Sequence, residues 1–136
     1  MSSYSTVTAV TESQLQAIFW EHVWNNYPQL RFHMWAVPND AIGQWTSTKD
    51  IIRSRELKAT GLLTGVWDLH LFWKGRLHII ETKLPGNSLT VTRISGTRKI
   101  YGQKEWGELM AAHGAIPHIY HTLPEGIAII EKIILT

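Results

Sequence analysis

The sequence contains no cysteine. This excludes disulfide bonds and thiolate-bound metals, and it is compatible with a reducing compartment. No stretch approaches the ~20 consecutive apolar residues that a membrane span requires. The first ten residues, MSSYSTVTAV, lack the basic start and the apolar centre of a signal peptide. We therefore predict an intracellular, cytoplasmic protein with no membrane partner.

Several enzyme motifs are missing as well. The sequence has no phosphate-binding P-loop, no dinucleotide fingerprint and no Gly-x-Ser-x-Gly nucleophile elbow. Seven histidines are present, but a zinc site needs more convergent ligands at tighter spacing. We interpret each histidine as a partly buried structural residue. His70 lies on the same strand face as Asp68, and a functional role beside Asp68 stays open for it.

Length and composition describe one soluble globular domain. The chain has 136 residues, 44% of them hydrophobic and 18% charged, with a formal net charge of +2. The stretch from Thr82 to Lys104 has no acidic residue, and its basic residues are Lys83, Arg93, Arg98, Lys99 and Lys104. Such a cationic run suits a phosphate backbone. On charge alone, a solvated loop and helix face is the simpler interpretation.

Helical and strand patterns alternate along the chain. Residues 1–10 are predicted to be flexible, and the pair Thr11 and Gln14 fits a capping box that opens a helix ending near Tyr27-Pro28. Further elements are predicted as a strand at 31–37, a helix at 49–60, strands at 66–73 and 76–83, a helix at 98–113, a strand at 116–121, and a segment at 124–134 that fits either a helix or a strand. Residues 84–97 are predicted to be an irregular or hairpin-like insertion. This order predicts a single α/β domain over residues 11–136, with a mixed central β-sheet flanked by helices.

The two apolar strands around Lys74-Gly75 carry charges that a buried sheet avoids. If Lys74 and Gly75 form a two-residue turn, Trp73 pairs with Arg76. The same register places Asp68 directly opposite Glu81, with Cβ atoms about 5 Å apart. A three-residue loop with a bulge at Gly75 would shift the register by one.

Two carboxylates in direct opposition destabilise a sheet. A divalent cation removes this conflict, because Mg²⁺ and Mn²⁺ bind hard oxygen ligands held close together. Lys83 lies two residues beyond Glu81 and so emerges on the same face. An Asp followed by Glu-x-Lys is a weak motif, and without further support a salt-bridged trio that binds nothing is the simpler interpretation.

An ordered set of motifs resembles the PD-(D/E)xK nuclease superfamily, and within it the small VRR-NUC type found as stand-alone phage and bacterial proteins. The matching pieces are Glu12-Ser13-Gln14-Leu15-Gln16, Tyr27-Pro28, Val37-Pro38-Asn39, Leu57-Lys58-Ala59-Thr60-Gly61, Gly65-Val66-Trp67-Asp68, Glu81-Thr82-Lys83, and Gln103-Lys104-Glu105-Trp106 followed by Leu109 and Gly114. The resemblance implies a restriction-endonuclease-like core. Two departures are Trp67, where the family usually has Pro, and the longer stretch between Lys83 and Gln103.

The resemblance also implies the roles of individual residues. Asp68, Glu81 and the backbone carbonyl of Thr82 would bind Mg²⁺ or Mn²⁺, and Lys83 would act on the attacking water. Glu12 would reach the metal directly or through water, although it also fits an ordinary first-turn Glu that favours the helix dipole.

Further residues are implied around this centre. Gln103 would approach from the later helix as a catalytic residue, and a solvated helix position is an equally good interpretation of it. The residues predicted to contact nucleic acid are Gln16, Asn39, Arg53, Lys58, Arg93, Arg98, Lys99 and Lys104. Ordinary surface charge is the alternative for each basic residue in this set.

The implied function is a Mg²⁺-dependent endodeoxyribonuclease in the cytoplasm of a bacterium or a phage-infected cell. The resemblance implies a homodimer that acts on branched DNA, such as four-way junctions or flaps. Three alternatives stay open: a non-catalytic nucleic-acid-binding or assembly module with the nuclease fold, a sequence-specific nuclease of the restriction type, and a nuclease directed at RNA.

Overall fold

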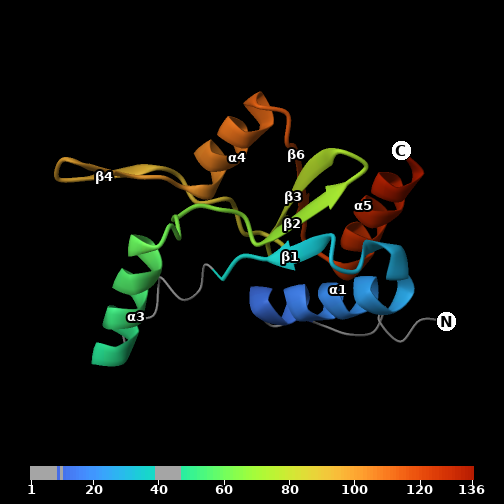
Figure 1. The fold of residues 1–136 in the computed structure, drawn as a ribbon, viewed down its shortest axis with the longest axis horizontal. Coiled ribbons are helices and arrows are strands. Elements are labelled where there is room, and N and C mark those ends of the chain that lie inside the picture. Colours follow the sequence, from blue (N-terminus) through green and yellow to red (C-terminus); the bar gives the residue numbers. More distant parts are fainter. Residues whose placement is uncertain (1–8, 10, 39–46) are drawn as a thin grey trace.

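The computed structural model describes residues 9, 11–38 and 47–136 (Figure 1). The segment predicted to be flexible, residues 1–10, lies outside the described residues except for Ala9, and Asn39 lies outside them too. The described elements are α1 (Glu12–Asn26), the 3-10 helix η2 (Pro28–Leu30), β1 (Met34–Ala36), α3 (Thr48–Ala59), β2 (Leu69–Trp73), β3 (Arg76–Thr82), β4 (Arg93–Ser95), β5 (Arg98–Ile100), α4 (Gln103–Ala112), β6 (Ile116–Tyr120) and α5 (Leu123–Leu135).

The central sheet has the strand order β1-β2-β3-β6. Strands β1 and β3 each pair with β2 in antiparallel fashion, whereas β3 and β6 run parallel. A parallel pair needs a long crossover, and here the chain between β3 and β6 contains the β4–β5 hairpin and α4. The structure therefore confirms an α/β fold with a mixed central sheet.

Local capping explains where the helices begin. At the start of α1, the Thr11 hydroxyl accepts from the Gln14 N–H at 3.1 Å, and the Gln14 side chain accepts from the Thr11 N–H at 3.2 Å. This reciprocal pair is the predicted capping box. The last apolar segment, which the pattern left open, is the helix α5: the Thr122 hydroxyl caps it by accepting from the Glu125 N–H, and Pro124 occupies its first turn.

The turn between β2 and β3 sets the register of the sheet. Lys74 and Gly75 have φ values of 51° and 77°, and positive φ at both central residues is typical of a type I′ turn. Trp73 pairs with Arg76, and the pairing continues to Leu69 opposite Ile80. The two-residue turn is confirmed, and there is no bulge at Gly75.

The hydrophobic core lies between one face of the sheet and the helices α1 and α5 (Figure 1). Its fully buried side chains include Phe19, Leu69, Leu71, Ile80, Tyr120 and Ile130. Phe19 and Tyr120 pack with their ring centroids 4.4 Å apart. The other face of the sheet is covered in part by α4, where the Trp67 indole is buried against Gly107. The core thus anchors the strands from one side, and α4 approaches the strand ends from the other.

Three predicted boundaries were wrong. The helix predicted from residue 98 begins at Gln103, because residues 98–100 pair with 93–95 as a hairpin. Gly96, the first of the two turn residues, has a φ of 64°, as a type II′ turn requires. The first strand begins at Met34 instead of residue 31, because η2 and a positive φ of 69° at Phe32 precede it. Strand β2 begins at Leu69 instead of residue 66.

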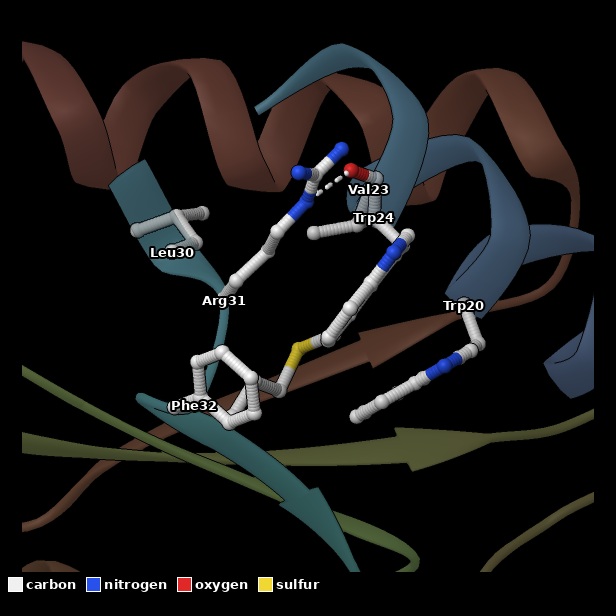
Figure 2. Close-up of a pocket in the computed structure, with 7 residues that line it drawn as sticks. Trp20, Val23, Trp24, Leu30, Arg31 and Phe32 are labelled. Atoms are coloured by element: carbon white, nitrogen blue, oxygen red, sulfur yellow. Dashed lines mark hydrogen bonds between the residues drawn. The ribbon is translucent and has the colours of Figure 1, made fainter. Parts of the chain in front are cut away.

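A small hollow lies between the C-terminal half of α1 and the start of β1 (Figure 2). The Arg31 Nε donates to the Trp24 carbonyl at 2.8 Å, and its guanidinium lies 5.1 Å from the centre of the Trp24 ring. The edge of Phe32 packs on Trp24, and Trp20 stacks on the other side of Trp24. The hollow has a volume of about 10 Å³, which is room for about one water. These contacts fix the connection between α1 and β1.

Replacing Gly107 by Ala should destabilise the protein. Ala is the better helix former, but its Cβ would collide with the Trp67 indole, and overpacking typically costs about 1–3 kcal/mol. We expect Gly107→Ala to lower the free energy of unfolding by that amount in urea denaturation. Glu108→Ala, at an exposed position of the same helix, is the control and should change it little. An unchanged Gly107→Ala would contradict the tight approach of α4 to Trp67.

Candidate functional site

The candidate site lies at the end of the β2–β3 hairpin opposite the Lys74-Gly75 turn. The Asp68 N–H donates to Glu81 Oε1 at 3.0 Å, and the Thr82 N–H donates to Asp68 Oδ2 at 3.2 Å. Each carboxylate thus accepts from the backbone of the opposite strand segment. The predicted placement of Asp68 against Glu81 is confirmed.

The Glu81 carboxyl is unusually placed for a charged group, with only 1% of the residue exposed. Burial, followed by the charge of the neighbouring Asp68, raises the pKa of Glu81 to about 9. Lys83 acts in the opposite direction but is the weaker influence. The two carboxyls therefore share the like-charge conflict that the sequence indicated, and at neutral pH one proton or one cation must relieve it.

Thr82 contributes its backbone as well as its side chain. The Lys83 N–H donates to the Tyr120 carbonyl on β6 at 3.1 Å. In a trans peptide the C=O points opposite to the N–H, so the Thr82 carbonyl points away from β6 and toward the Asp68 side. The Thr82 hydroxyl donates to the Tyr120 hydroxyl oxygen at 2.6 Å, which fixes the strand end. Burial of Tyr120 raises the pKa of its phenol, and Thr82 opposes that shift.

Lys83 bridges the sheet end and the first helix. Its Nζ lies 3.8 Å from Glu81 Oε2 and 4.0 Å from Glu12 Oε1, and the residue is 7% exposed. The second oxygen of Glu12 accepts from the Leu84 N–H at 3.3 Å and from Asn87 Nδ2 at 3.0 Å. Glu12 is therefore directed into the site, where it holds both Lys83 and the loop that follows β3. The alternative, in which Glu12 only favours the dipole of α1, does not account for these contacts.

Gln103 is brought to the site by α4. Its Nε2 donates to Glu81 Oε2, while its Oε1 accepts from the Thr90 N–H at 3.2 Å. The Trp67 indole N–H donates to the Gln103 carbonyl at 2.8 Å. The prediction that Gln103 approaches from the later helix is confirmed, and the alternative of a solvated position is wrong.

Three supporting residues escaped the sequence analysis: Asn87, Thr90 and Trp67. The first two lie in the stretch interpreted as an insertion, where no periodicity indicates a partner. Trp67 was interpreted as a core residue and as a departure from the family motif, without a partner at the site. Its hydrogen bond to the first residue of α4 depends on tertiary packing, and no local signal predicts it.

The remaining predicted residues are spread over three places. Gln16 lies one turn beyond Glu12 on α1 and is partly buried. Arg53 and Lys58 are exposed on α3, which stands apart from the sheet (Figure 1). Exposed basic residues of the β4–β5 hairpin and the first turn of α4 form the third group, namely Arg93, Arg98, Lys99 and Lys104.

The donor set fits a hard divalent cation with a partly open coordination shell. Two carboxylates and one backbone carbonyl are oxygen ligands of the kind that Mg²⁺ and Mn²⁺ prefer. Within the described ranges, no group of three or more His, Cys, Asp or Glu side chains converges on one point. A bound ion would therefore rely on water or substrate oxygens for its other positions, as Mg²⁺ commonly does.

Other polar groups lie outside this constellation. His78 and His118 form a stacked pair with a nitrogen-to-nitrogen distance of 2.9 Å. Burial, the charge of His78 and then that of Lys132 lower the pKa of His118 to about 4. His70 stacks on Trp106 with ring centroids 5.7 Å apart, so it joins α4 to β2.

In the described part of the chain, no helix has the length and apolar character that crossing a membrane requires.

Comparisons with family models, with curated proteins and with solved structures return no match. The geometry of the site is therefore the basis for its interpretation.

The stability of the metal-free protein should fall as pH rises from 7 to 9. A carboxyl whose pKa is raised in the folded state binds its proton more tightly there, so raising the pH above the unfolded pKa removes stability until about pH 9. The slope for one such group cannot exceed about 1.4 kcal/mol per pH unit. His118 does not contribute in this window, because it is neutral in both states above its unfolded pKa.

Urea denaturation in EDTA at pH 7, 8 and 9 measures this effect. Glu81→Gln keeps the shape of the protonated carboxyl and should flatten the dependence, whereas Glu21→Gln, at an exposed position of α1, should retain it. A wild-type stability that is constant or rises over this range would contradict the burial of Glu81 beside the like-charged Asp68.

Proposed function

We propose that this protein is a metal-dependent DNA endonuclease of the PD-(D/E)xK type. One observation carries the proposal: Asp68 and Glu81 interlock through backbone hydrogen bonds of 3.0 and 3.2 Å, with the Lys83 ammonium 3.8 Å from Glu81. A fold that needed only stability would gain by avoiding two opposed carboxylates. An enzyme that binds a cation gains a ligand pair from them.

The residues divide the chemistry among them. Asp68, Glu81 and the Thr82 carbonyl would hold a Mg²⁺ or Mn²⁺ ion, which when bound lowers the pKa of a water and neutralises charge on a phosphoryl group. Lys83 orients the attacking water and stabilises the negative charge that develops on the phosphate oxygens. Glu12 keeps the Lys83 ammonium in place from the side of α1.

Gln103 has a positioning role in this scheme. It donates to one oxygen of Glu81, while the other oxygen accepts from the Asp68 N–H. The carboxylate is therefore held from both sides, and its rotation is restricted. Preorganisation of this kind lowers the cost of reaching the geometry for in-line attack on a phosphodiester.

The resemblance extends the proposal to the substrate and the assembly. It favours branched DNA, four-way junctions or flaps, and a homodimer whose two-fold axis would match paired cuts on a two-fold substrate. The competing proposal is a non-catalytic module with the same fold that binds nucleic acid. The complete set of Asp68, Glu81 and Lys83 favours the enzyme, because a binding module has no use for a buried Glu81 carboxyl held against a second, partly buried carboxyl.

Cleavage of labelled DNA tests the proposal. We expect cutting with Mg²⁺ or Mn²⁺ and none with EDTA. Asp68→Asn and Lys83→Ala should each lower the cleavage rate by at least about 100-fold, the size of effect typical for a lost transition-state contact or proton-transfer group. Glu21→Gln and Lys74→Ala, at exposed positions away from the site, are the matched controls and should cut like the wild type.

The substrate panel decides between the remaining possibilities. It comprises a four-way junction, a flap, linear duplex DNA and RNA, each with both metals. Binding without cutting on every substrate would replace the enzyme with the binding module. Cutting at one sequence, or of RNA alone, would identify a different class of nuclease.

A further inference from the structure

We infer that the β4–β5 hairpin is an arm that enters the major groove of duplex DNA beside the candidate site. This inference rests on the proposed nuclease function and names the substrate contact that the core alone does not provide. The arm comprises residues 91–101. Its strands extend away from the central sheet on the same side of the molecule as α3 (Figure 1).

The register of the arm separates its charges onto two faces. Arg93 pairs with Ile100 and Ser95 pairs with Arg98, so both arginines lie on one face. Lys99 lies on the other face, where its ammonium bonds to Glu105 Oε1 at 3.0 Å. The positive charge of Lys99 is therefore compensated, and the free charge of the arm belongs to the two arginines.

These arginines suit a polyanion. Both side chains are exposed, and neither forms a hydrogen bond or an ion pair with another described residue. Arg93 and Arg98 are diagonal neighbours across the hairpin, and residues in this relation are about 7–8 Å apart. The stretch from Thr82 to Lys104 has no acidic residue that could pair with them. Each strand of duplex DNA presents a phosphate about every 3.4 Å along the helix axis, so two phosphates are within reach of the pair.

The shape of the arm indicates which nucleic acid it fits. A two-stranded β-ribbon is an element that the major groove of B-form DNA admits. The major groove of A-form RNA is too deep and narrow for side chains to read. The arm also exposes Val91 and Ile94 by 69% and 70%, far from any core. Apolar side chains in the major groove contact thymine methyl groups. Ile94 lies on the face of the arm opposite the two arginines, so this face can meet the bases while the arginines reach the phosphates.

Hydrogen bonds connect the root of the arm to the candidate site. Thr90, which precedes the arm, accepts from the Gln103 N–H through its hydroxyl at 3.0 Å and donates its own N–H to Gln103 Oε1 at 3.2 Å. Gln103 in turn donates to Glu81.

A second set of contacts fixes the arm to α4. The Gly102 N–H donates to the Thr92 hydroxyl at 3.1 Å, and that hydroxyl donates to Glu105. A Cβ on Gly102 would collide with the backbone of residues 90–92, so the two segments pack backbone against backbone. A duplex held by the arm is therefore at a fixed position relative to Glu81.

Equilibrium binding in EDTA tests the arm without cleavage. The probe is a fluorescent 30-bp duplex DNA, titrated at several salt concentrations with the wild type and with the double variant Arg93→Gln/Arg98→Gln. The matched control is Lys74→Gln/Arg76→Gln, which removes two charges from the turn of the β2–β3 hairpin, at the end opposite the candidate site. Thermal melting establishes that each variant is folded.

We expect the arm variant to bind the duplex at least about tenfold more weakly, with a salt slope reduced by about 1.8 for two lost phosphate contacts. The control should keep both values, and the wild type should bind duplex DNA more tightly than duplex RNA or single-stranded DNA of equal length. Unchanged affinity in the arm variant, equal binding of the three probes, or no binding of the duplex by the wild type would each overturn the inference.

The two proposals fail in different ways. Arm-dependent binding without cleavage by Mg²⁺ or Mn²⁺ would overturn the nuclease and leave the arm in place. Cleavage by a protein whose arm variant binds and cuts duplex DNA like the wild type would overturn the arm alone.

Discussion

The antiparallel pairing of β2 with β3 is the constraint on which the rest of the structure depends. The type I′ turn at Lys74-Gly75 fixes the register, and in this register the strand ends bring Asp68 against Glu81. A shift of one residue would turn the apolar side chains away from the core and separate the two carboxyls. The same register therefore determines both the hydrophobic core and the candidate site.

Hydrogen bonds and an ion pair around the site hold the Glu81 carboxyl, whose buried position beside Asp68 is unfavourable by itself. Burial and the charge of Asp68 disfavour ionisation of Glu81, while Gln103 and Lys83 contact its outer oxygen. Elements from both faces of the sheet take part, since Glu12 comes from α1 and Gln103 from α4. Placing Glu81 against Asp68 costs stability, and this cost is understandable if the site binds a cation and a phosphate. This is the physical basis of the proposed function.

Much of the fold could be predicted from local signals. The capping box at Thr11 and the turn at Lys74-Gly75 use side chains and backbone angles that only neighbouring residues influence. The boundary at residue 98 could not be predicted, because residues 98–100 carry a pattern compatible with a helix and become a strand only by pairing with 93–95. The place of Gln103 beside Glu81 was available only through the resemblance, and its contacts with Thr90 and Trp67 were not available at all.

The sequence by itself indicated most of the alternation of helices and strands, and a two-residue turn at Lys74-Gly75 was enough to place Asp68 opposite Glu81, because short-range turn geometry and strand periodicity specify these features. Only the tertiary structure decided that Glu12 contacts Lys83, that Lys99 is neutralised by Glu105 while Arg93 and Arg98 are not, and that the arm is joined to Glu81 through Gln103. These contacts depend on how α1, α4 and the arm pack at one end of the sheet. Contacts between segments that are distant in the sequence produce no periodic pattern of residues from which they could be predicted.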